Sequence, residues 1–427
     1  MVKKNNKYGF ATRAIHSGAS PEAVTGARNT PIYQTTSYVF KNTKHAERLF
    51  KLEDFGFIYS RLTNPTVSVL EERLANLENS RAAVACSSGH ASQQLVFASL
   101  LKNNDHFIAS NKLYGGSINQ FNKTFRKFGW ECSFVDPDNI TNFENAIRKN
   151  TKLIFIETLS NPDGSIVDIQ AVANIAIKYH IPLVVDNTLA TPFLHNPKNW
   201  GANIITHSLT KFICGNGTSM GGIVIDCGNF DYLQDEKFPS LSKPDSSYNN
   251  IRFSETFGDF GFAMKVKADT LRDLGCSLSP QNAFYILNGI ETLNLRMKQH
   301  TDNALKVATY LQQHPKVSFV SYSGLKNNYY YDLGKKYFPN GPGSIFTIKL
   351  KNGYKACVSM VENVKLLSHV ANVGDTRSLI IHPASTTHSQ LSDKEKIKAG
   401  AGPDVIRLSI GLEDVEDIIR DLEISIK

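Results

Sequence analysis

The chain has 427 residues, more than one ordinary domain holds, which predicts two packed domains. Its hydrophobic fraction of 41% and charged fraction of 20% are typical of globular proteins, and no apolar run approaches membrane-spanning length. The net charge of +8 favours anionic partners. Because lysine and arginine are spread along the chain without a dense basic block, nucleic-acid binding is not expected.

The N-terminus and the cysteines indicate the compartment. Residues Met1–Lys7 are basic but no apolar run follows them, so we expect no signal peptide and a cytoplasmic location. Six cysteines are scattered without a Cys-x-x-Cys pair. That spacing argues against a zinc site and against a disulfide framework.

The first half of the chain predicts a sheet protein with an N-terminal arm. Residues 1–60 lack a clean hydrophobic period and are expected to form an extended arm. A helix is expected from Asn64, as N-cap, through Pro65 at its first position to Leu77. Apolar strands then alternate with amphipathic helices, which predicts a mainly parallel sheet covered on both faces. The strand candidates are Ala82–Cys86, His106–Ser110, Cys132–Asp136, Leu153–Glu157, Leu183–Asp186, Ile204–Thr206 and Gly222–Asp226.

The second half predicts a linker helix and a smaller domain. Residues 229–265 are polar and turn-rich, and we expect a long excursion from the sheet. One long helix is then expected from about Ser279 to Gln312, linking the domains. Strands near Val317–Ser321 and Ser344–Leu350 suit a small α+β domain. The expected division is an arm (1–60), a large domain (61–295) and a small domain (296–427).

Polar side chains follow two strands where ligands of α/β sheets bind. Asp186 ends one buried strand, and Ser208, Thr210 and Lys211 follow the next strand along the chain. A lysine beside hydroxyls, facing a buried aspartate, suits pyridoxal 5′-phosphate. The amine condenses with the aldehyde, the aspartate keeps the pyridine nitrogen protonated, and the hydroxyls hold phosphate oxygens. An ordinary Asp–Lys ion pair at the strand ends is the alternative.

Two further segments suit a phosphate group. Ser88, Gly89 and His90 lie between a strand and a helix, where backbone N–H groups at the helix N-terminus can surround an anion. Such glycine turns are common, so this signal alone is weak. Tyr59 and Arg61, just before the Asn64 helix, offer a phenol and a guanidinium that also suit phosphate.

Two more residues suit the organic part of a cofactor or substrate. Tyr114 stands beside Gly115 and Gly116, where its ring can lie on an aromatic cofactor or can simply pack. Arg407 has apolar neighbours, so its charge needs a carboxylate. That partner is either a structural acid or the α-carboxylate of an amino-acid substrate.

Six segments together resemble the Cys/Met-metabolism family of pyridoxal-phosphate enzymes, in order and over nearly the whole chain. The resemblance implies an aspartate-aminotransferase-like (fold type I) large domain with a mainly parallel seven-stranded sheet, plus a smaller C-terminal α+β domain. The segments are Tyr59–Thr66, Glu157–Pro162, Val185–Thr188, Ser208–Lys211, Ile381–His388 and Arg407–Asp414.

The resemblance also implies residue roles. Lys211 carries the cofactor and shuttles protons, Asp186 pairs with the ring nitrogen, and Tyr114 stacks on the ring. Tyr59 and Arg61 reach the phosphate of a neighbouring subunit, which implies a homotetramer built from dimers that share active sites. The implied cofactor-binding residues are Tyr59, Arg61, Ser88, Gly89, His90, Tyr114, Asn161, Asp186, Ser208, Thr210 and Lys211, and the implied substrate-binding residues are Arg407 and Asn372. His90 departs from the methionine common in the family.

Within the family, the excursion resembles the insertion of O-acetylhomoserine sulfhydrylases. Its resembling parts include residues 238–248, 253–262 and 271–275. The implied reaction is γ-replacement of O-acetylhomoserine by sulfide or methanethiol, giving homocysteine or methionine and acetate. A methionine or cystathionine γ-lyase and a cystathionine γ-synthase remain the alternatives, although Gly116 stands where methionine γ-lyases usually carry cysteine.

Overall fold

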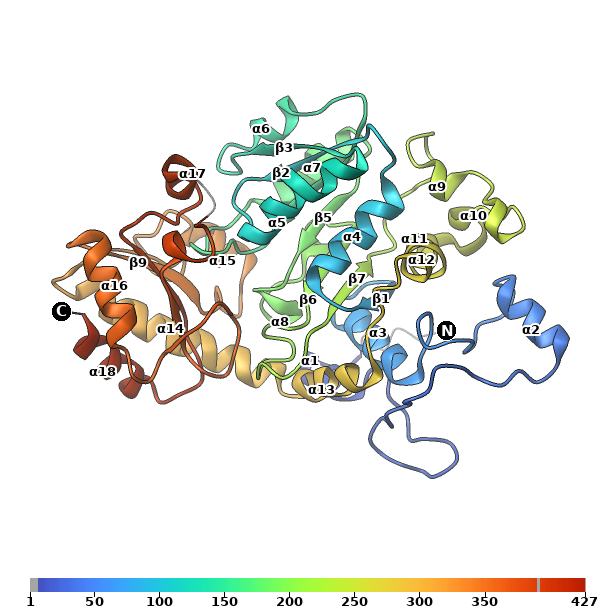
Figure 1. Ribbon diagram of the computed structural model, residues 1–427, viewed down its shortest axis with the longest axis horizontal. Helices are drawn as coiled ribbons and strands as arrows, with labels where there is room; N and C mark the ends of the chain where they lie inside the picture. The colour runs from blue at the N-terminus through green and yellow to red at the C-terminus, as the bar shows by residue number, and fades with distance from the viewer. Residues whose placement is uncertain (1–6, 390–391, 427) are drawn as a thin grey trace.

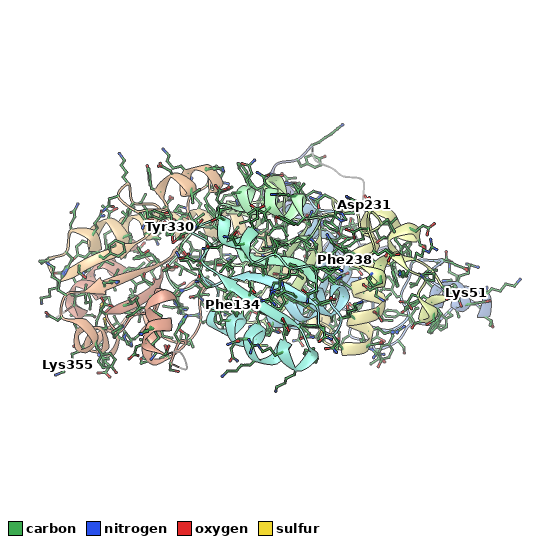
Figure 2. The ribbon with its side chains drawn as sticks, turned by 90° about the horizontal axis from the view of Figure 1, so that it is seen from above. Lys51, Phe134, Asp231, Phe238, Tyr330 and Lys355 are labelled. Carbon is green, nitrogen blue, oxygen red and sulfur yellow. The ribbon has the colours of Figure 1, made fainter. Side chains whose placement is uncertain are left out.

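The computed structural model describes residues 7–389 and 392–426 (Figure 1). Residues 1–6 of the expected arm lie outside the described residues. The molecule is elongated, with Lys51 of the arm at one end and Lys355 at the other (Figure 2). Within the described ranges, no helix is both long and apolar enough to cross a membrane.

The large sheet has seven strands in the order β1-β7-β6-β5-β4-β2-β3, which confirms the expected α/β class. Strands β3, β2, β4, β5 and β6 pair in parallel, whereas β7 is antiparallel to both of its neighbours. The strands are β1 (Ala82–Cys86), β2 (His106–Ser110), β3 (Glu131–Val135), β4 (Thr151–Glu157), β5 (Leu183–Asp186), β6 (Ile204–Ser208) and β7 (Gly222–Asp226).

Alternating side chains of each strand enter two separate cores. In β4, Ile154 and Ile156 pack on one face, whereas Leu153 and Phe155 pack on the other. Helices α3 (Pro65–Leu77), α7 (Ile169–Lys178) and α13 (Pro280–Glu291) cover the first face, and α4 (Gly89–Leu100) with the excursion covers the second. Each such side chain contributes about 1.5–3 kcal/mol when fully buried. The sheet is therefore held rigidly, and its strand ends have fixed positions.

The N-terminal segment has one part that packs on the body and one part that extends from it. The Asn64 side chain accepts the N–H groups of Thr66 and Val67 and so caps α3, as expected. Helix α1 (Phe10–His16) packs on the body, where Ala14 is fully buried and Arg13 donates to the Asn76 carbonyl of α3. The chain then extends away from the body, with α2 (Thr43–Phe50) at its tip (Figure 1).

The expected single helix from Ser279 to Gln312 is wrong, because two helices meet at Thr292. These are α13 and α14 (Leu293–Gln313). The Thr292 hydroxyl donates to the Gly289 carbonyl at 3.4 Å and accepts from Arg296 Nε at 3.3 Å. A β-branched hydroxyl residue competes with the helical backbone in this way. The expected domain boundary between residues 295 and 296 falls inside α14 and stays a prediction.

The second sheet has five strands in the order β10-β11-β12-β9-β8 and packs against α14, α16 and α18. Its strands are β8 (Val317–Ser321), β9 (Ile345–Leu350), β10 (Ser368–His369), β11 (Leu379–Ile381) and β12 (Val405–Ser409). Strands β8 and β9 lie close to the two strands predicted for this domain. The other helices are α5 (Gly115–Asn119), α6 (Thr141–Asn145), α8 (Thr191–Leu194), α9 (Pro239–Ser242), α10 (Phe253–Phe257), α11 (Gly261–Lys265), α12 (Arg272–Leu274), α15 (Tyr331–Tyr337), α16 (Gly353–Asn363), α17 (Asp393–Lys398) and α18 (Val415–Ser425).

Candidate active site

A cavity of about 250 Å³ lies where β4, β5 and β6 end and where the small sheet meets the large one. Eleven of the thirteen site residues expected from the sequence line it. They come from segments as far apart as residues 88 and 407, which only the fold brings together. The eleven are Ser88, Gly89, His90, Tyr114, Asn161, Asp186, Ser208, Thr210, Lys211, Asn372 and Arg407.

Asp186 is a buried carboxylate at the end of β5, 8% exposed. Its Oδ1 accepts the Thr188 N–H at 3.0 Å, and its Oδ2 accepts the Thr206 hydroxyl at 3.1 Å. No lysine or arginine of the described residues pairs with it. A buried carboxylate without a cation is unfavourable, so this site requires a positive group from outside the chain.

The structure does not contain the Asp186–Lys211 ion pair that the sequence left as an alternative. The Lys211 amine instead donates to Asn372 Oδ1 at 2.6 Å. Burial, and then the nearby charge of Arg407, lower the pKa of Lys211 to about 8. An amine with a pKa near 8 is neutral in a far larger share of molecules at physiological pH than an ordinary lysine, so it can attack an aldehyde and can accept a proton.

This lowered pKa predicts the pH dependence of cofactor capture. Only the neutral amine attacks an aldehyde, so the rate at which the cofactor-free chain binds pyridoxal phosphate covalently should rise with pH and reach half its plateau near pH 8. With an ordinary lysine, the rate would reach half its plateau only at about pH 10.4. Stopped-flow absorbance between pH 6 and 10 measures this, and a midpoint near 10 would contradict the assigned environment of Lys211.

The turn before α4 forms an anion-binding corner of the cavity. The Ser88 hydroxyl caps the helix by accepting the Ala91 N–H at 3.1 Å. A Cβ added to Gly89 would lie 2.8 Å from the Ser208 Cβ, so the turn packs directly against the end of β6. The free N–H groups of the first helical turn and the hydroxyl of Ser208 therefore face the same space, and such a corner binds phosphate.

Arg407 brings a buried positive charge from β12 and is only 3% exposed. Its Nη1 donates to Asn161 Oδ1 at 3.2 Å, and its Nη2 donates to the Asn372 carbonyl at 2.7 Å. Its Nε has no partner, and no carboxylate of the described residues pairs with the group. Burial lowers the pKa of Arg407 to about 10, which leaves it charged at neutral pH. The guanidinium is therefore free to bind an anion in the cavity.

Tyr114 lies at the N-terminus of α5, with 42% of its surface exposed. Its ring lies 5.8 Å from that of His90, with 27° between the two planes. Its backbone N–H donates to Glu157 Oε1 at 2.8 Å. The phenol is thus available to a molecule in the cavity, and its backbone is held by a carboxyl group.

Tyr59 and Arg61 are the two expected residues that do not line this cavity. Both line a second, more open cavity of about 600 Å³ with Thr35, Thr36 and the segment before α13. Arg61 Nη1 donates to the Arg272 carbonyl at 3.0 Å. Within one chain, the structure does not bring them to Lys211.

Sequence reasoning missed nine lining residues. Glu157 and Thr188 lie inside motifs that the sequence does present, but their side chains carried no separate signal there. Gln93 and Ser117 lie on helices, where nothing local distinguishes them from packing residues. The nine are Gln93, Ser117, Glu157, Leu159, Thr188, Leu189, Ala371, Val373 and Thr387.

The family model of Cys/Met metabolism PLP-dependent enzymes matches residues 11–427. The chain belongs to this family. It is 46% identical to the O-acetyl-L-homoserine sulfhydrylase of Leptospira meyeri, over 97% of this chain and 96% of that protein. It is 42% identical to the homocysteine synthase of Schizosaccharomyces pombe, over 96% of each chain.

A solved structure shares the fold of the whole chain. It is an assigned O-acetylhomoserine (thiol)-lyase of Campylobacter jejuni, with N′-pyridoxyl-lysine-5′-monophosphate in its chain. The TM-score is 0.95 and the identity 40%, over 98% of this chain and all of that one. The fold expected from the sequence is thereby confirmed.

Membership of this family makes pyridoxal phosphate the cofactor. The residues present fit this group. Asp186 lacks a cation, which a protonated pyridine nitrogen supplies, and the corner at Gly89 and Ser208 suits a phosphate. Lys211, in the same cavity, offers an amine whose pKa of about 8 suits attack on an aldehyde.

Proposed function

We propose that the chain catalyses γ-replacement on O-acetylhomoserine, with sulfide or methanethiol as the incoming nucleophile. The products are homocysteine or methionine, and acetate. The observation that carries this proposal is the buried guanidinium of Arg407, which no acid of the described residues neutralises, in the cavity that holds Lys211 and Asp186. A free α-carboxylate fits that charge, and relatives named as O-acetylhomoserine sulfhydrylases support the choice of substrate.

In this proposal, chain residues hold the cofactor and the substrate at fixed places. Asp186 keeps a proton on the ring nitrogen, and the α4 N-terminus with Ser208 and Thr210 binds the phosphate. Asn161 orients Arg407, whose guanidinium binds the substrate carboxylate. Bound pyridoxal phosphate supplies an electron sink for the bonds broken at the substrate's α- and β-carbons.

Two residues move protons. Lys211 removes the proton from the substrate's Cα and later returns one, which its lowered pKa allows. Tyr114, exposed to the cavity, donates a proton to the departing acetate oxygen. Leu159, Leu189 and Val373 line the same space and limit the access of water to the bound substrate.

A substrate panel tests this function. At a fixed concentration of sulfide, the purified chain should use O-acetylhomoserine at least about tenfold better in kcat/KM than O-succinylhomoserine, O-acetylserine or methionine. A preference for O-succinylhomoserine with cysteine would support cystathionine γ-synthase. Release of a ketone and ammonia from methionine would support a γ-lyase.

We also propose that the active form is a homotetramer built from dimers that share active sites. Tyr59 and Arg61 lie on the exposed arm, away from Lys211 of their own chain, which suits contact with a neighbouring subunit's phosphate. The arm also exposes Val39, Phe50 and Phe55, the kind of surface that a subunit interface covers.

Shared sites predict complementation between two inactive variants. In the proposed dimer, each site takes Lys211 from one subunit and Arg61 from the other. A dimer that mixes Lys211→Ala with Arg61→Ala therefore contains one site in which both residues are intact. Refolding an equal mixture should therefore restore about a quarter of the unmodified activity, because half of the dimers are mixed. Steady-state assays of the mixture and of each variant alone measure this. No recovery would contradict the sharing of sites.

We propose a cytoplasmic location as well. The six cysteines are free, which suits a reducing compartment, and the proposed substrates are small metabolites.

A further inference from the structure

Glu157 lies between Asp186, the buried carboxylate of the site, and the loop of Tyr114, the proposed proton donor. It ends β4, and the sheet order places β4 between β5, which ends at Asp186, and β2, which leads to the Tyr114 loop. Glu157 and Asp186 are partners in the β4–β5 register. Its side chain lines the cavity, although the residue is only 6% exposed.

Its carboxyl group is bonded to the Tyr114 loop on one side and faces Asn161 on the other. Oε1 accepts the Tyr114 N–H at 2.8 Å. The backbone N–H of Asn161 faces this carboxyl group and lowers its pKa, and the Asn161 side chain accepts from Arg407 Nη1 at 3.2 Å. Glu157 therefore lies between the loop of the proton donor and the residue that orients the carboxylate-binding guanidinium.

We propose that Glu157 is a positioning residue that fixes the Tyr114 loop and Asn161 relative to each other through its carboxyl oxygens. This rests on the proposed function, because it assigns to Glu157 the placement of Tyr114 at the leaving group. Tyr114 is the N-cap residue of α5, and its carbonyl accepts the Ser117 N–H at 2.9 Å and the Ile118 N–H at 3.1 Å, so the helix holds the carbonyl side of the residue. The Glu157 carboxyl group holds the amide side of Tyr114 and so fixes, together with α5, where the phenol starts from the backbone.

In this proposal Glu157 serves as a hydrogen-bond acceptor, because its raised pKa favours the neutral acid over a second negative charge. Burial, and then the neighbouring carboxylate of Asp186, raise the pKa of Glu157 well above its ordinary value. The neutral acid keeps a carbonyl oxygen that can accept the Tyr114 N–H. It also leaves Asp186 as the single negative charge beside the ring nitrogen of the cofactor.

Two substitutions of the holoenzyme separate acceptor from charge. Glu157→Leu fills a similar volume without an acceptor, and it should lower kcat by about 100-fold, the cost of a small misplacement of a catalytic group. KM should change less than about fivefold, because Arg407 keeps its bond to the Asn372 carbonyl. Glu157→Gln keeps a carbonyl and no charge, so it should restore kcat to within about fivefold of the unmodified chain.

Two readouts distinguish positioning from general stability. The visible circular dichroism of the bound cofactor reports the ring's surroundings, and its amplitude per bound cofactor should fall at least about twofold in Glu157→Leu but not in Glu157→Gln. The loss of kcat in Glu157→Leu should also disappear in a Tyr114→Phe background, because both act through one phenol.

Asp226 supplies the matched control. It is 4% exposed at the opposite end of the sheet, where its two oxygens accept the N–H groups of Gly228 at 2.9 Å and Ala263 at 3.0 Å. Asp226→Leu should lower the unfolding temperature as much as Glu157→Leu does, yet leave kcat and the dichroism unchanged. If Glu157→Leu does not fold, Glu157→Asp, whose carboxyl is one methylene shorter, carries the same expectation.

The proposal is overturned if Glu157→Gln loses as much kcat as Glu157→Leu, since the charge would then matter. It is also overturned if Glu157→Leu keeps its kcat, or if the Glu157 and Tyr114 effects add. A failure of the proposed function can be told apart from a failure of this proposal. In the first case the unmodified chain forms no homocysteine, and the dichroism of the variants still tests whether Glu157 positions Tyr114.

Discussion

Replacing Lys211 with alanine is expected to lower the rate of homocysteine formation by at least about 10,000-fold. The side chain has two roles in the proposed reaction, covalent attachment of the cofactor and proton transfer at Cα. No other lysine of the described chain lines the cavity, so no amine can replace it. The variant should also lose the visible absorption band of the covalently bound cofactor, which absorbance spectroscopy measures directly.

Lys265 provides the control for this variant. It is also buried, at 6% exposure, but it pairs with Asp245 at 2.9 Å and Asp269 at 2.8 Å under the excursion. Lys265→Ala should keep the absorption band and most of the activity per folded molecule. Retention of the band in Lys211→Ala, or its loss in Lys265→Ala, would place the cofactor on a different lysine.

Replacing Arg407 with leucine is expected to raise KM for O-acetylhomoserine by about 10- to 150-fold, the range of a lost hydrogen bond between charged groups. The buried guanidinium has an unpartnered Nε and no acid of the described residues beside it, so its charge is available to the substrate. Leucine removes that attraction and leaves the α-carboxylate in a poorly solvated space. Initial-rate kinetics over a range of substrate concentrations measure the change.

Two comparisons sharpen the Arg407 test. Arg407→Lys keeps the charge but not the planar fork, so its KM should lie between those of the unmodified chain and of Arg407→Leu. Thermal unfolding of both variants shows whether the fold is retained. An unchanged KM in a folded Arg407→Leu variant would mean that the substrate carboxylate binds elsewhere.

Local patterns predicted the strands of the large sheet, and β8 and β9 of the small one, closely, but not β10, β11 and β12. Asp186 and Lys211 were found from sequence because Asp186 ends one buried strand and Lys211 comes just after the next, and the carboxyl ends of neighbouring parallel strands meet at one edge. The Asn64 cap and the start of α3 followed from residue types at adjacent positions. Such features need no knowledge of distant segments.

Features that depend on distant segments were not predictable in the same way. The bond between Lys211 and Asn372 joins residues 161 positions apart, across the two sheets. Glu157 stood inside a visible motif, but its importance depends on β2 and β5 lying on either side of β4, an order that strand patterns do not specify. The break at Thr292 depends on a side chain bonding to the helix backbone, while the apolar period continues through it.

The fate of O-acetylhomoserine with and without sulfide tests the central claim most directly. With sulfide, the purified holoenzyme should form homocysteine and acetate in equal amounts, measured by chromatography of the thiol and of the acid. Without sulfide, the release of acetate should slow strongly. If the chain instead releases a ketone and ammonia at the same rate whether or not sulfide is present, it is a lyase and the assignment of γ-replacement is wrong.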